Sequence, residues 1–396
     1  MSPRFLQVHT LSPYTAVLLN RDDSGLPKRL LYGGVSRTRV ASQCLKRHWR
    51  MADDPRALEK ISVASFRSRH LVERIIEQAR SSGVRWEDDV AEALAPWFQF
   101  AIYGFDPKDA PTKQGERSRI EEIRQPVLFG LPEIKWLGAE FSRLMAEADG
   151  NAENAFRLAQ RWVAGEGTGR PAKSFRANMK AMRENTQLPG GLTAALCGRL
   201  VTSDPAANIA GPLHVAHSFT VHAEESETDY LTAVDDLLNA GSGAATIQET
   251  ELTSSLFYGY VVVDIPALAA NLGEVFPAAP LTGKVLDSLV HLIAEISPGA
   301  KRGSTAPYSR ASLMLLEAGD RQPRSLAEAY RTPCAPELKA AAQALAAHLS
   351  KLDEVYATGE QRRLLSIADV PFAGAESGSL ADIADWARKL PQQSTA

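Results

Sequence analysis

The sequence predicts an α+β fold in which a ferredoxin-like sheet is interrupted by a long helical insertion. Strand patterns occur at residues 5–11, 213–222, 256–264 and 308–316, and helical patterns at 43–51 and 285–296. From about residue 54 to residue 189 the pattern is instead helical and polar. With that stretch set aside, the order is strand, helix, strand, strand, helix, strand. This is the order of a ferredoxin-like domain, which RNA-recognition modules share.

Four segments follow from this pattern. Residues 1–53 form the first part of the sheet domain, 54–190 the helical insertion, 191–226 a projecting hairpin, and 227–396 the rest of the sheet domain with C-terminal helices, among them an Ala-rich helix at 335–356. The projecting hairpin is predicted from two strand-like runs, 196–201 and 213–222. The loop between them, Thr202 to Pro212, contains Asp204-Pro205 and Gly211-Pro212. A second, tighter hairpin is expected where Thr253-Ser254-Ser255 joins the runs 245–252 and 256–264.

Length and composition indicate a globular protein. The chain has 396 residues, of which 44% are hydrophobic, enough for two or three domains with real cores. Cys44, Cys197 and Cys334 are odd in number and lack a CxxC spacing, which favours neither disulfides nor a cysteine zinc site and fits reducing cytoplasm. The N-terminus has no apolar signal region, and the apolar run near residue 260 is cut by Asp264, so no membrane role is expected.

The distribution of charge is more informative than its total. Residues 20–50 hold eight Lys or Arg and two Asp, a local charge of +6 in a chain whose formal net charge is −3. The remainder therefore carries about −9 by subtraction. A basic concentration in an acidic chain is typical of a surface that binds a polyanion, most commonly a nucleic acid.

The pattern inside this segment predicts a basic helix face. With Ser42 as the N-cap, Gln43 and three cations recur at helical spacing, while Leu45 and Trp49 fall on the opposite, buried face. The predicted binding face consists of Gln43, Lys46, Arg47 and Arg50. Upstream, Gly33-Gly34 permits close backbone approach to a ligand, and Arg37 and Arg39 alternate at strand spacing. The alternative interpretation is a solvated basic helix beside a turn.

A second basic concentration lies between residues 161 and 183. Lys173, Arg176, Lys180 and Arg183 step by three and four, so a helix would align them. The aromatic strand Phe257 to Val263 resembles the third strand of an RNA-recognition module, although it lacks the leading Lys/Arg-Gly. Two interpretations stay open for its aromatic residues: stacking on bases, or packing in the core.

Other site chemistry is not favoured by the sequence. His214, His217 and His222 do not share one face of a strand, so they do not converge on a metal. Asp22-Asp23 follows Arg21 directly, and capping the turn explains these acids better than a metal site does. The chain shows neither GxxxxGK[ST] nor GxGxxG, nor HExxH, nor a nucleophile elbow. We therefore expect no catalytic residue, no metal and no cofactor.

An ordered set of residues resembles the backbone subunit of the type I-E CRISPR Cascade complex, the CasC family. The N-terminal signature comprises Leu19 to Asp23, Lys28, Gly33-Gly34, Arg37, Arg39, Ser42-Gln43, Leu45 to Arg47 and Arg50. Further matches are Leu196 to Leu200, Asp204-Pro205, Asn208, Ala216-His217, His222, Asp229 to Leu237, the FYGY strand and Ser297 to Arg302. The resemblance covers most of residues 1–320.

The resemblance implies a hand-shaped subunit with a palm, a helical finger insertion and a thumb hairpin. Copies would stack head to tail along the spacer of the guide RNA, kink it at intervals and expose its bases for pairing with target DNA, beside the other Cascade subunits. The implied RNA-binding residues are Arg21, Lys28, Arg37, Arg39, Gln43, Lys46 and Arg50. The finger cations Lys173, Arg176 and Lys180 would contact guide or target strand, and Asp204, Asn208, His214 and His217 would belong to the thumb.

Two other classes of function remain as alternatives. A ferredoxin-like endoribonuclease that processes repeat RNA needs a histidine base near the basic groove. The only candidate there is His48, which the helical pattern places away from the Arg/Lys face. A solitary DNA-binding regulator would instead form a closed dimer on a defined operator.

Overall fold

The computed structural model describes residues 2–81, 83, 86–104, 110–112, 126–165, 175–233 and 246–392. The chain divides into two compact units. One comprises Met1–Ile61, Leu213–Ala269 and Glu274–Ala396, and is called the palm below. The other comprises Ser62–Pro212 with Ala270–Gly273, and is called the helical unit. Within the described residues, no helix is long and apolar enough to cross a membrane.

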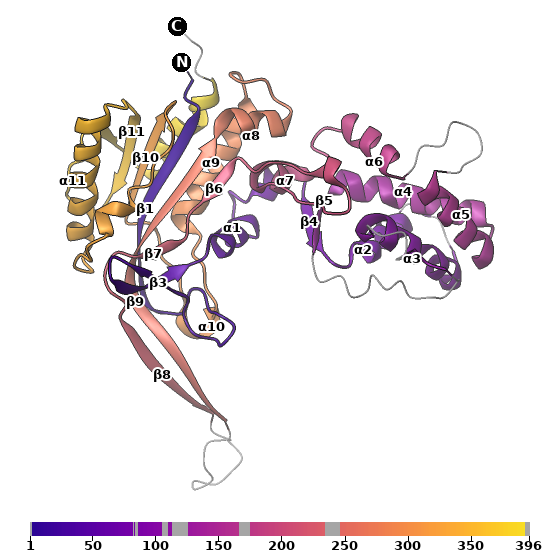
Figure 1. Cartoon of the computed structure of the whole chain (residues 1–396), viewed down its shortest axis with the longest axis horizontal. Coiled ribbons are helices and arrows are strands. Elements are labelled where there is room, and N and C mark those ends of the chain that lie inside the picture. Colours follow the sequence, from indigo (N-terminus) through magenta and orange to yellow (C-terminus); the bar gives the residue numbers. More distant parts are fainter. Residues whose placement is uncertain are drawn as a thin grey trace. The chain divides into compact units, whose positions relative to one another are not determined.

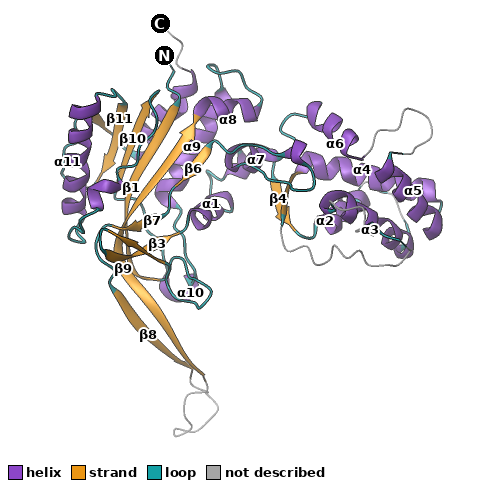
Figure 2. Cartoon of the chain, in the orientation of Figure 1, coloured by secondary structure: helices purple, strands orange, loops and turns teal. Residues whose placement is uncertain are grey.

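The palm is built on one mixed sheet (Figure 2). Its strand order is β12 (Ala375–Ser377), β11 (Gln361–Ser366), β10 (Leu313–Gly319), β1 (Phe5–Val17), β9 (Thr246–Asp264), β7 (Ser218–Thr220), β3 (Val35–Val40) and β2 (Arg29–Tyr32). Strands β6 (Leu213–Val215) and β8 (Ser226–Ala233) also pair with β9. The palm helices are α1 (Ser42–Arg50), α9 (Pro280–Glu295), α10 (Arg302–Thr305), α11 (Leu338–Tyr356) and α12 (Leu380–Lys389), while α8 (Ile265–Leu272) directly follows β9.

The centre of this sheet has the predicted ferredoxin-like order. In chain order the elements are β1, α1, β7, β9, α9 and β10, and the strands lie side by side as β10-β1-β9-β7. All three pairings are antiparallel. The fourth strand beside the first, then the third and the second, is the arrangement of the split βαβ motif. The α+β prediction is therefore confirmed.

The two faces of the sheet are covered by different helices (Figure 1). Helices α1 and α9 lie on one face, where Phe257 packs with Val17, Val40 and the half-buried Leu45. Helix α11 lies on the other, where Tyr258 packs with Tyr330 and Leu345, among others. Because side chains alternate along a strand, the adjacent aromatic residues of β9 belong to opposite cores.

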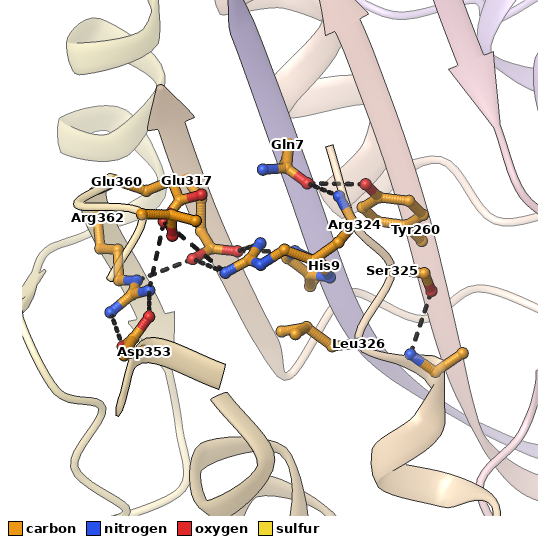
Figure 3. A network of polar contacts seen from close by, with 12 residues as sticks. Gln7, His9, Tyr260, Glu317, Arg324, Ser325, Leu326, Asp353, Glu360 and Arg362 are labelled. Carbon is orange, nitrogen blue, oxygen red and sulfur yellow. Dashed lines mark hydrogen bonds and ion pairs between the residues drawn. The ribbon is translucent and has the colours of Figure 1, made fainter. Parts of the chain in front are cut away.

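A buried polar network fixes α11 and β11 to the centre of the sheet (Figure 3). Glu317 of β10 accepts hydrogen bonds from Arg324, Arg362 and His9. Arg362 also donates to Asp353 of α11, with both distances 2.6 Å. His9 donates through Nε2 to Glu317, so its Nδ1 accepts from the Tyr258 hydroxyl, and that hydroxyl accepts from the Leu326 backbone N–H. Each polar side chain of this hydrogen-bonded network thus has a partner within the palm.

Strand β9 runs without interruption through the predicted tight turn, so the hairpin expected at Thr253-Ser254-Ser255 is wrong. The hydroxyls that favoured a turn are satisfied within the sheet. Thr253 and Ser255 bond to each other at 2.5 Å, and Ser254 accepts from the backbone N–H of Ala16. Ala16 has a positive φ of 50° at an irregularity of β1. At this point β1 ends beside β9, and β8 becomes its partner.

The projecting hairpin is therefore β8–β9 rather than the predicted 191–226. Figure 1 shows β8 and the first half of β9 extending beyond the other palm strands. Residues 234–245 lie outside the described part of the chain. In the predicted thumb segment, residues 191–197 form helix α7 (Gly191–Cys197), and β6 and β7 pair with β9 inside the palm sheet. Of the predicted strand 196–201, Leu196 and Cys197 belong to α7, Gly198 ends that helix, and Arg199 forms an isolated antiparallel bridge with Ile209.

The helical unit contains a small antiparallel pair and a bundle of helices. These are β4 (Ser65–Ser68), β5 (Val127–Gly130), α2 (Leu71–Arg80), α3 (Asp88–Tyr103), α4 (Leu131–Ala148), α5 (Ala152–Ala164), α6 (Phe175–Glu184) and α7. Its core is rich in aromatic residues, with Phe98 stacked on Trp162 at 4.4 Å between ring centroids. The unit begins at Ser62 and continues to Pro212, so the loop 202–212 belongs to it and not to a projecting thumb.

Candidate nucleic-acid interface

The basic segment begins with a turn that its acidic residue organises. The side chain of Asp22 accepts hydrogen bonds from the backbone N–H groups of Ser24 and Leu26. This is the turn-capping role expected for this acid, and it leaves the neighbouring Arg21 exposed. Asn20 completes the loop by accepting from the Ala41 backbone N–H at the start of α1.

Helix α1 has the predicted amphipathic arrangement. Trp49 is buried, at 4% exposure, and Leu45 packs against the sheet. Gln43 and Arg47 are exposed, whereas Lys46 and Arg50 are half-buried. The Nζ of Lys46 donates to the Leu213 carbonyl at 2.9 Å, which ties α1 to the start of β6. The helix begins at Ser42, so the N-cap is Ala41 rather than the predicted Ser42.

Arg37 does not lie on a binding surface, so its assignment to RNA is wrong. Its side chain is 0% exposed and donates to three backbone carbonyls, those of Tyr32, Thr220 and Tyr330. The bonds to Thr220 and Tyr330 measure 3.0 and 2.9 Å. The C-terminal segment that carries Tyr330 covers this part of β3, and strand spacing alone does not reveal such a cover. Arg37 is a core residue that joins three segments of the palm.

The Gly33-Gly34 turn has a related explanation. Gly33 has a φ of +64°, and a Cβ placed there would lie 1.6 Å from the Arg331 carbonyl oxygen. The close backbone approach that Gly33 permits is therefore to the protein's own C-terminal segment, whereas a Cβ at Gly34 would meet no atom within 4 Å.

Arg39, Lys28 and His217 come together at the edge of the palm sheet. The Nη1 of Arg39 donates to Nδ1 of His217 at 2.8 Å, and its Nε donates to the Arg29 carbonyl at 3.0 Å. Desolvation and the charges of Arg39 and Lys28 lower the pKa of His217. This exposed histidine lies in the two-residue break between β6 and β7, which pair with successive parts of β9. Sequence analysis placed it in a thumb, but the structure places it in the basic cluster of the palm.

Arg29 is engaged by acids at the base of the hairpin. It forms ion pairs with Glu224, which precedes β8, and with Glu251 of β9. Glu224 also accepts from the Ser36 hydroxyl of β3. One of the eight cations of the basic segment is thus neutralised inside the palm, and it connects the projecting hairpin to strands β2 and β3.

A segment distant in the sequence completes the cluster. His48 has its Nδ1 bonded to the Cys44 carbonyl at 2.8 Å, and desolvation together with the charges of Arg302 and Arg47 lowers its pKa. The neighbouring Lys301 donates to the Thr250 hydroxyl of β9. The sequence signal for these residues was the Lys301-Arg302 pair, but no local pattern places it beside α1. We call Lys28, Arg39, Arg47, His48, His217 and Arg302 the basic surface.

The remaining thumb assignments are only partly consistent with the structure. His214 is exposed on β6, opposite Val262 of β9. Asn208 is exposed and accepts from the Val201 backbone N–H. The assignment of Asp204 to a projecting thumb is wrong, because it accepts from Arg183 at 2.6 Å inside the helical unit. Arg183 also pairs with the fully buried Glu133, which pairs in turn with Arg199. These charges hold the loop 202–212 against the helices.

The finger cations differ in their surroundings. Lys173 lies outside the described residues. Arg176 is exposed at the start of α6 and donates to the Gly104 carbonyl at 3.2 Å. Lys180 is exposed and lies 3.8 Å from Glu184. Arg183, on the same helix, forms ion pairs with Glu133 and Asp204, so its guanidinium group is directed into the helical unit.

Base stacking by the aromatic residues of β9 is not supported by the structure. Phe257 and Tyr258 are 2% and 1% exposed. Tyr260 is half-buried, stacks on His9 at 4.9 Å between centroids and donates to Gln7. In an RNA-recognition module such residues lie on an open sheet face, whereas here the segment from Leu326 to α11 covers that face. The core interpretation is the correct one.

The histidines do not converge on a metal. His222 is buried, with Nδ1 bonded to the Ala223 carbonyl and Nε2 accepting from the Leu256 N–H. His214 and His217 are both exposed; His214 lies on β6, and His217 lies in the break between β6 and β7. Among the described residues no group of three or more His, Cys, Asp or Glu side chains is arranged to hold an ion.

The fold and this surface define a class of protein: an α+β palm with an RNA-recognition-like strand order, a helical insertion and a cationic patch at one edge of its sheet. The model of the CT1975-like protein family matches residues 6–388. The chain belongs to this family. A search of curated proteins finds no match.

Two solved structures share the fold over nearly the whole chain. One, described as "CRISPR RNA-guided surveillance complex, pre-nicking", is 23% identical, with a TM-score of 0.75 over 98% of this chain and all of that one. Another, described as "CRISPR RNA-guided surveillance complex", is 20% identical, with a TM-score of 0.66 over 97% of this chain and 99% of that one. The resemblance to the Cascade backbone family seen in the sequence is thereby confirmed.

Proposed function

We propose that the protein is a non-catalytic, guide-RNA-binding subunit of a CRISPR surveillance complex. The observation that carries this proposal is the basic surface, where cations from two distant segments meet beside His217 near the β2 edge of an RNA-recognition-like sheet. Support comes from the two similar structures, whose descriptions name RNA-guided complexes. Exposed Arg21 and Gln43, with half-buried Lys46 and Arg50, extend the cationic area along α1 and the loop before β2.

The residues present suit sequence-independent binding. Guanidinium groups bond phosphates through two N–H groups and Lys supplies a point charge, so neither needs a particular base. Sequence specificity would then come from base pairing between guide and target DNA. In this proposal copies of the chain assemble head to tail along the guide in the cytoplasm, with other Cascade subunits. The β8–β9 hairpin takes the thumb role, kinking the guide, and Lys173, Arg176 and Lys180 contact guide or target strand.

Purification of the tagged protein from cells that express its neighbouring subunits and repeat RNA tests this proposal. We expect RNA of uniform length to co-purify with the other subunits. If about five phosphate contacts form, the log–log dependence of RNA affinity on salt should have a slope near −3.5. A closed dimer that protects one operator sequence, with no bound RNA, would contradict the proposal.

Nuclease activity is the second outcome to measure, because the structure places His48 next to Arg47 and Arg302 rather than away from the cations. Incubation of the purified protein with repeat RNA, without divalent metal, should leave the RNA intact. Cleavage that is lost in His48→Ala would instead support the endoribonuclease alternative.

A further inference from the structure

The hydrogen bond between Arg39 and His217 fixes the protonation state of the histidine. An arginine guanidinium is always a donor, so the His217 Nδ1, 2.8 Å from Arg39 Nη1, must be an acceptor and the ring must be neutral. The Nε of Arg39 donates to the Arg29 carbonyl. Two nitrogens of the Arg39 guanidinium group, Nε and Nη1, thus donate to neutral acceptors, while Nη2 has no partner among the described residues. The fork is oriented before any ligand arrives.

The groups around His217 are cationic. From β3 it faces Arg39, and from the segment before β2 it faces Lys28. The contact with β9 next to His217 is uncharged, because the preceding residue, Ala216, donates its backbone N–H to the Tyr260 carbonyl. Desolvation and these two cations lower the pKa of His217, and no carboxylate contributes. An anion placed on Arg39 would change this balance directly.

We propose that His217 is a proton-linked positioning residue of the basic surface, which holds Arg39 while neutral and takes up a proton when an RNA phosphate binds there. The inference rests on the proposed RNA-binding function and adds a regulatory property to it. A phosphate cancels the positive charge that disfavours the imidazolium. The protonated ring then donates from both nitrogens, and Arg39 is released to turn its fork toward the phosphate.

The sign of the pH dependence follows from linkage. Free protein holds His217 with a pKa below the ordinary value of 6.5, and bound phosphate raises that pKa. A site that binds more protons in the complex than in the free protein binds its ligand more tightly as pH falls. RNA affinity should therefore increase from pH 7.5 to pH 5.5, by on the order of threefold to tenfold, which is below the limit of about a hundredfold that one fully linked proton sets over two pH units.

The experiment measures binding of a single-stranded RNA oligonucleotide to the full-length protein by calorimetry, at both pH values and in buffers of different ionisation enthalpy. The wild type should take up a fraction of a proton per site. His217→Gln keeps an amide acceptor for Arg39 but does not titrate, so it should lose part of the proton uptake and the part of the pH dependence that His217 contributes. His217→Ala should weaken binding at pH 7.5 as well.

His70→Gln is the matched control, because His70 is exposed beside Glu73 in the helical unit and is not part of the basic surface. Its proton uptake should equal that of the wild type. His48→Gln measures how much of the proton uptake comes from His48, the other histidine of the basic surface. Equal proton uptake by wild type and His217→Gln, or tighter binding at higher pH, would overturn the inference. Absence of RNA binding by the wild type at both pH values would instead refute the proposed function.

Discussion

The eight cations of the basic segment fall into four groups by their surroundings. Arg37 is a core residue bonded to carbonyls, and Arg29 is neutralised by two glutamates. Arg39 and Lys46 are half-buried, each with a neutral partner. The remaining four are Arg21, Lys28, Arg47 and Arg50, of which Arg21 and Arg47 are exposed. Similar residues in one segment therefore require different tests.

Arg37→Ala is expected to destabilise the palm by about 3 kcal/mol, because it leaves buried carbonyls without donors and opens a cavity. Chemical denaturation measures this loss. The matched substitution Arg47→Ala, at an exposed position of the same basic segment, should change stability by less than about 0.5 kcal/mol. An equally mild effect of both substitutions would contradict the core role of Arg37.

The double variant Arg21→Ala/Arg47→Ala is expected to fold normally and to bind RNA about tenfold more weakly, uniformly across sequences. Loss of two phosphate contacts should reduce the magnitude of the salt slope by about 1.4. Binding titrations on several unrelated RNAs at several salt concentrations measure both effects. Arg80→Ala/Arg157→Ala, which removes two exposed arginines from the helical unit, is the control and should leave the slope unchanged. A loss confined to some sequences would argue for base readout instead.

Among the elements, the β8–β9 hairpin and helix α11 have contrasting surroundings. The hairpin has few contacts with the rest of the palm beyond its base, where Arg29 and Lys301 hold it. Between Arg199 and Lys284 the chain contains no Lys or Arg, and Glu225, Glu227, Asp229 and Glu249 are exposed. An acidic hairpin does not attract phosphates. Helix α11, in contrast, is fixed by buried ion pairs.

Replacing residues 229–249 by Gly-Gly is expected to leave a folded palm that binds RNA but no longer forms long RNA-dependent assemblies. The pairing of β9 with β8 from Glu251 and with β1 from Thr253 is retained, and a projecting element contributes little to the core. Sedimentation with long and short RNA measures the assembly. Deletion of 202–212, by comparison, should unfold the helical unit, because Ser203 and Ala207 are buried there. Unchanged assemblies of the hairpin variant would refute a thumb role.

The network under α11 predicts acid sensitivity of the palm. Burial lowers the pKa of His9, so the folded state binds fewer protons than the unfolded state, and stability decreases as pH falls below about 6.5. Burial alone would raise the pKa of Glu317, but bonds from His9 and Arg324 outweigh it and hold the pKa well below its usual value. Stability is therefore lost further as pH falls below about 4.5.

Thermal unfolding between pH 7.5 and pH 4 tests this expectation. The wild type should lose stability progressively, whereas His9→Gln should start less stable and show a smaller decrease between pH 6.5 and pH 5. His348→Gln, at a less buried position of α11, is the comparison. Identical pH profiles for wild type and His9→Gln would show that His9 does not contribute.

At the scale of the whole molecule, the periodicity of the sequence predicts the fold class, but it does not predict which distant segments pack over a given residue. The amphipathic pattern of α1 and the strand–helix order predicted the ferredoxin-like centre, because both depend on local spacing. The position of Arg302 beside His48 and the burial of Arg37 depend on contacts across more than 250 residues, which local spacing does not encode. The projecting hairpin was not predicted at β8–β9 because the hydroxyls of Thr253, Ser254 and Ser255 resemble a turn, whereas they are satisfied within one continuous strand.

Helix α11 covers one face of the sheet, and this also bears on which parts of a bound RNA would be free to pair with another nucleic-acid strand. An open RNA-recognition sheet uses its aromatic residues to stack bases, and those bases are then occupied by protein. Here Tyr258 is enclosed on the α11 face, and Phe257 is enclosed in the core on the opposite face of the sheet. If the palm binds RNA as proposed, it would contact the sugar–phosphate backbone through the basic surface, and the bases would then remain available for pairing with another strand.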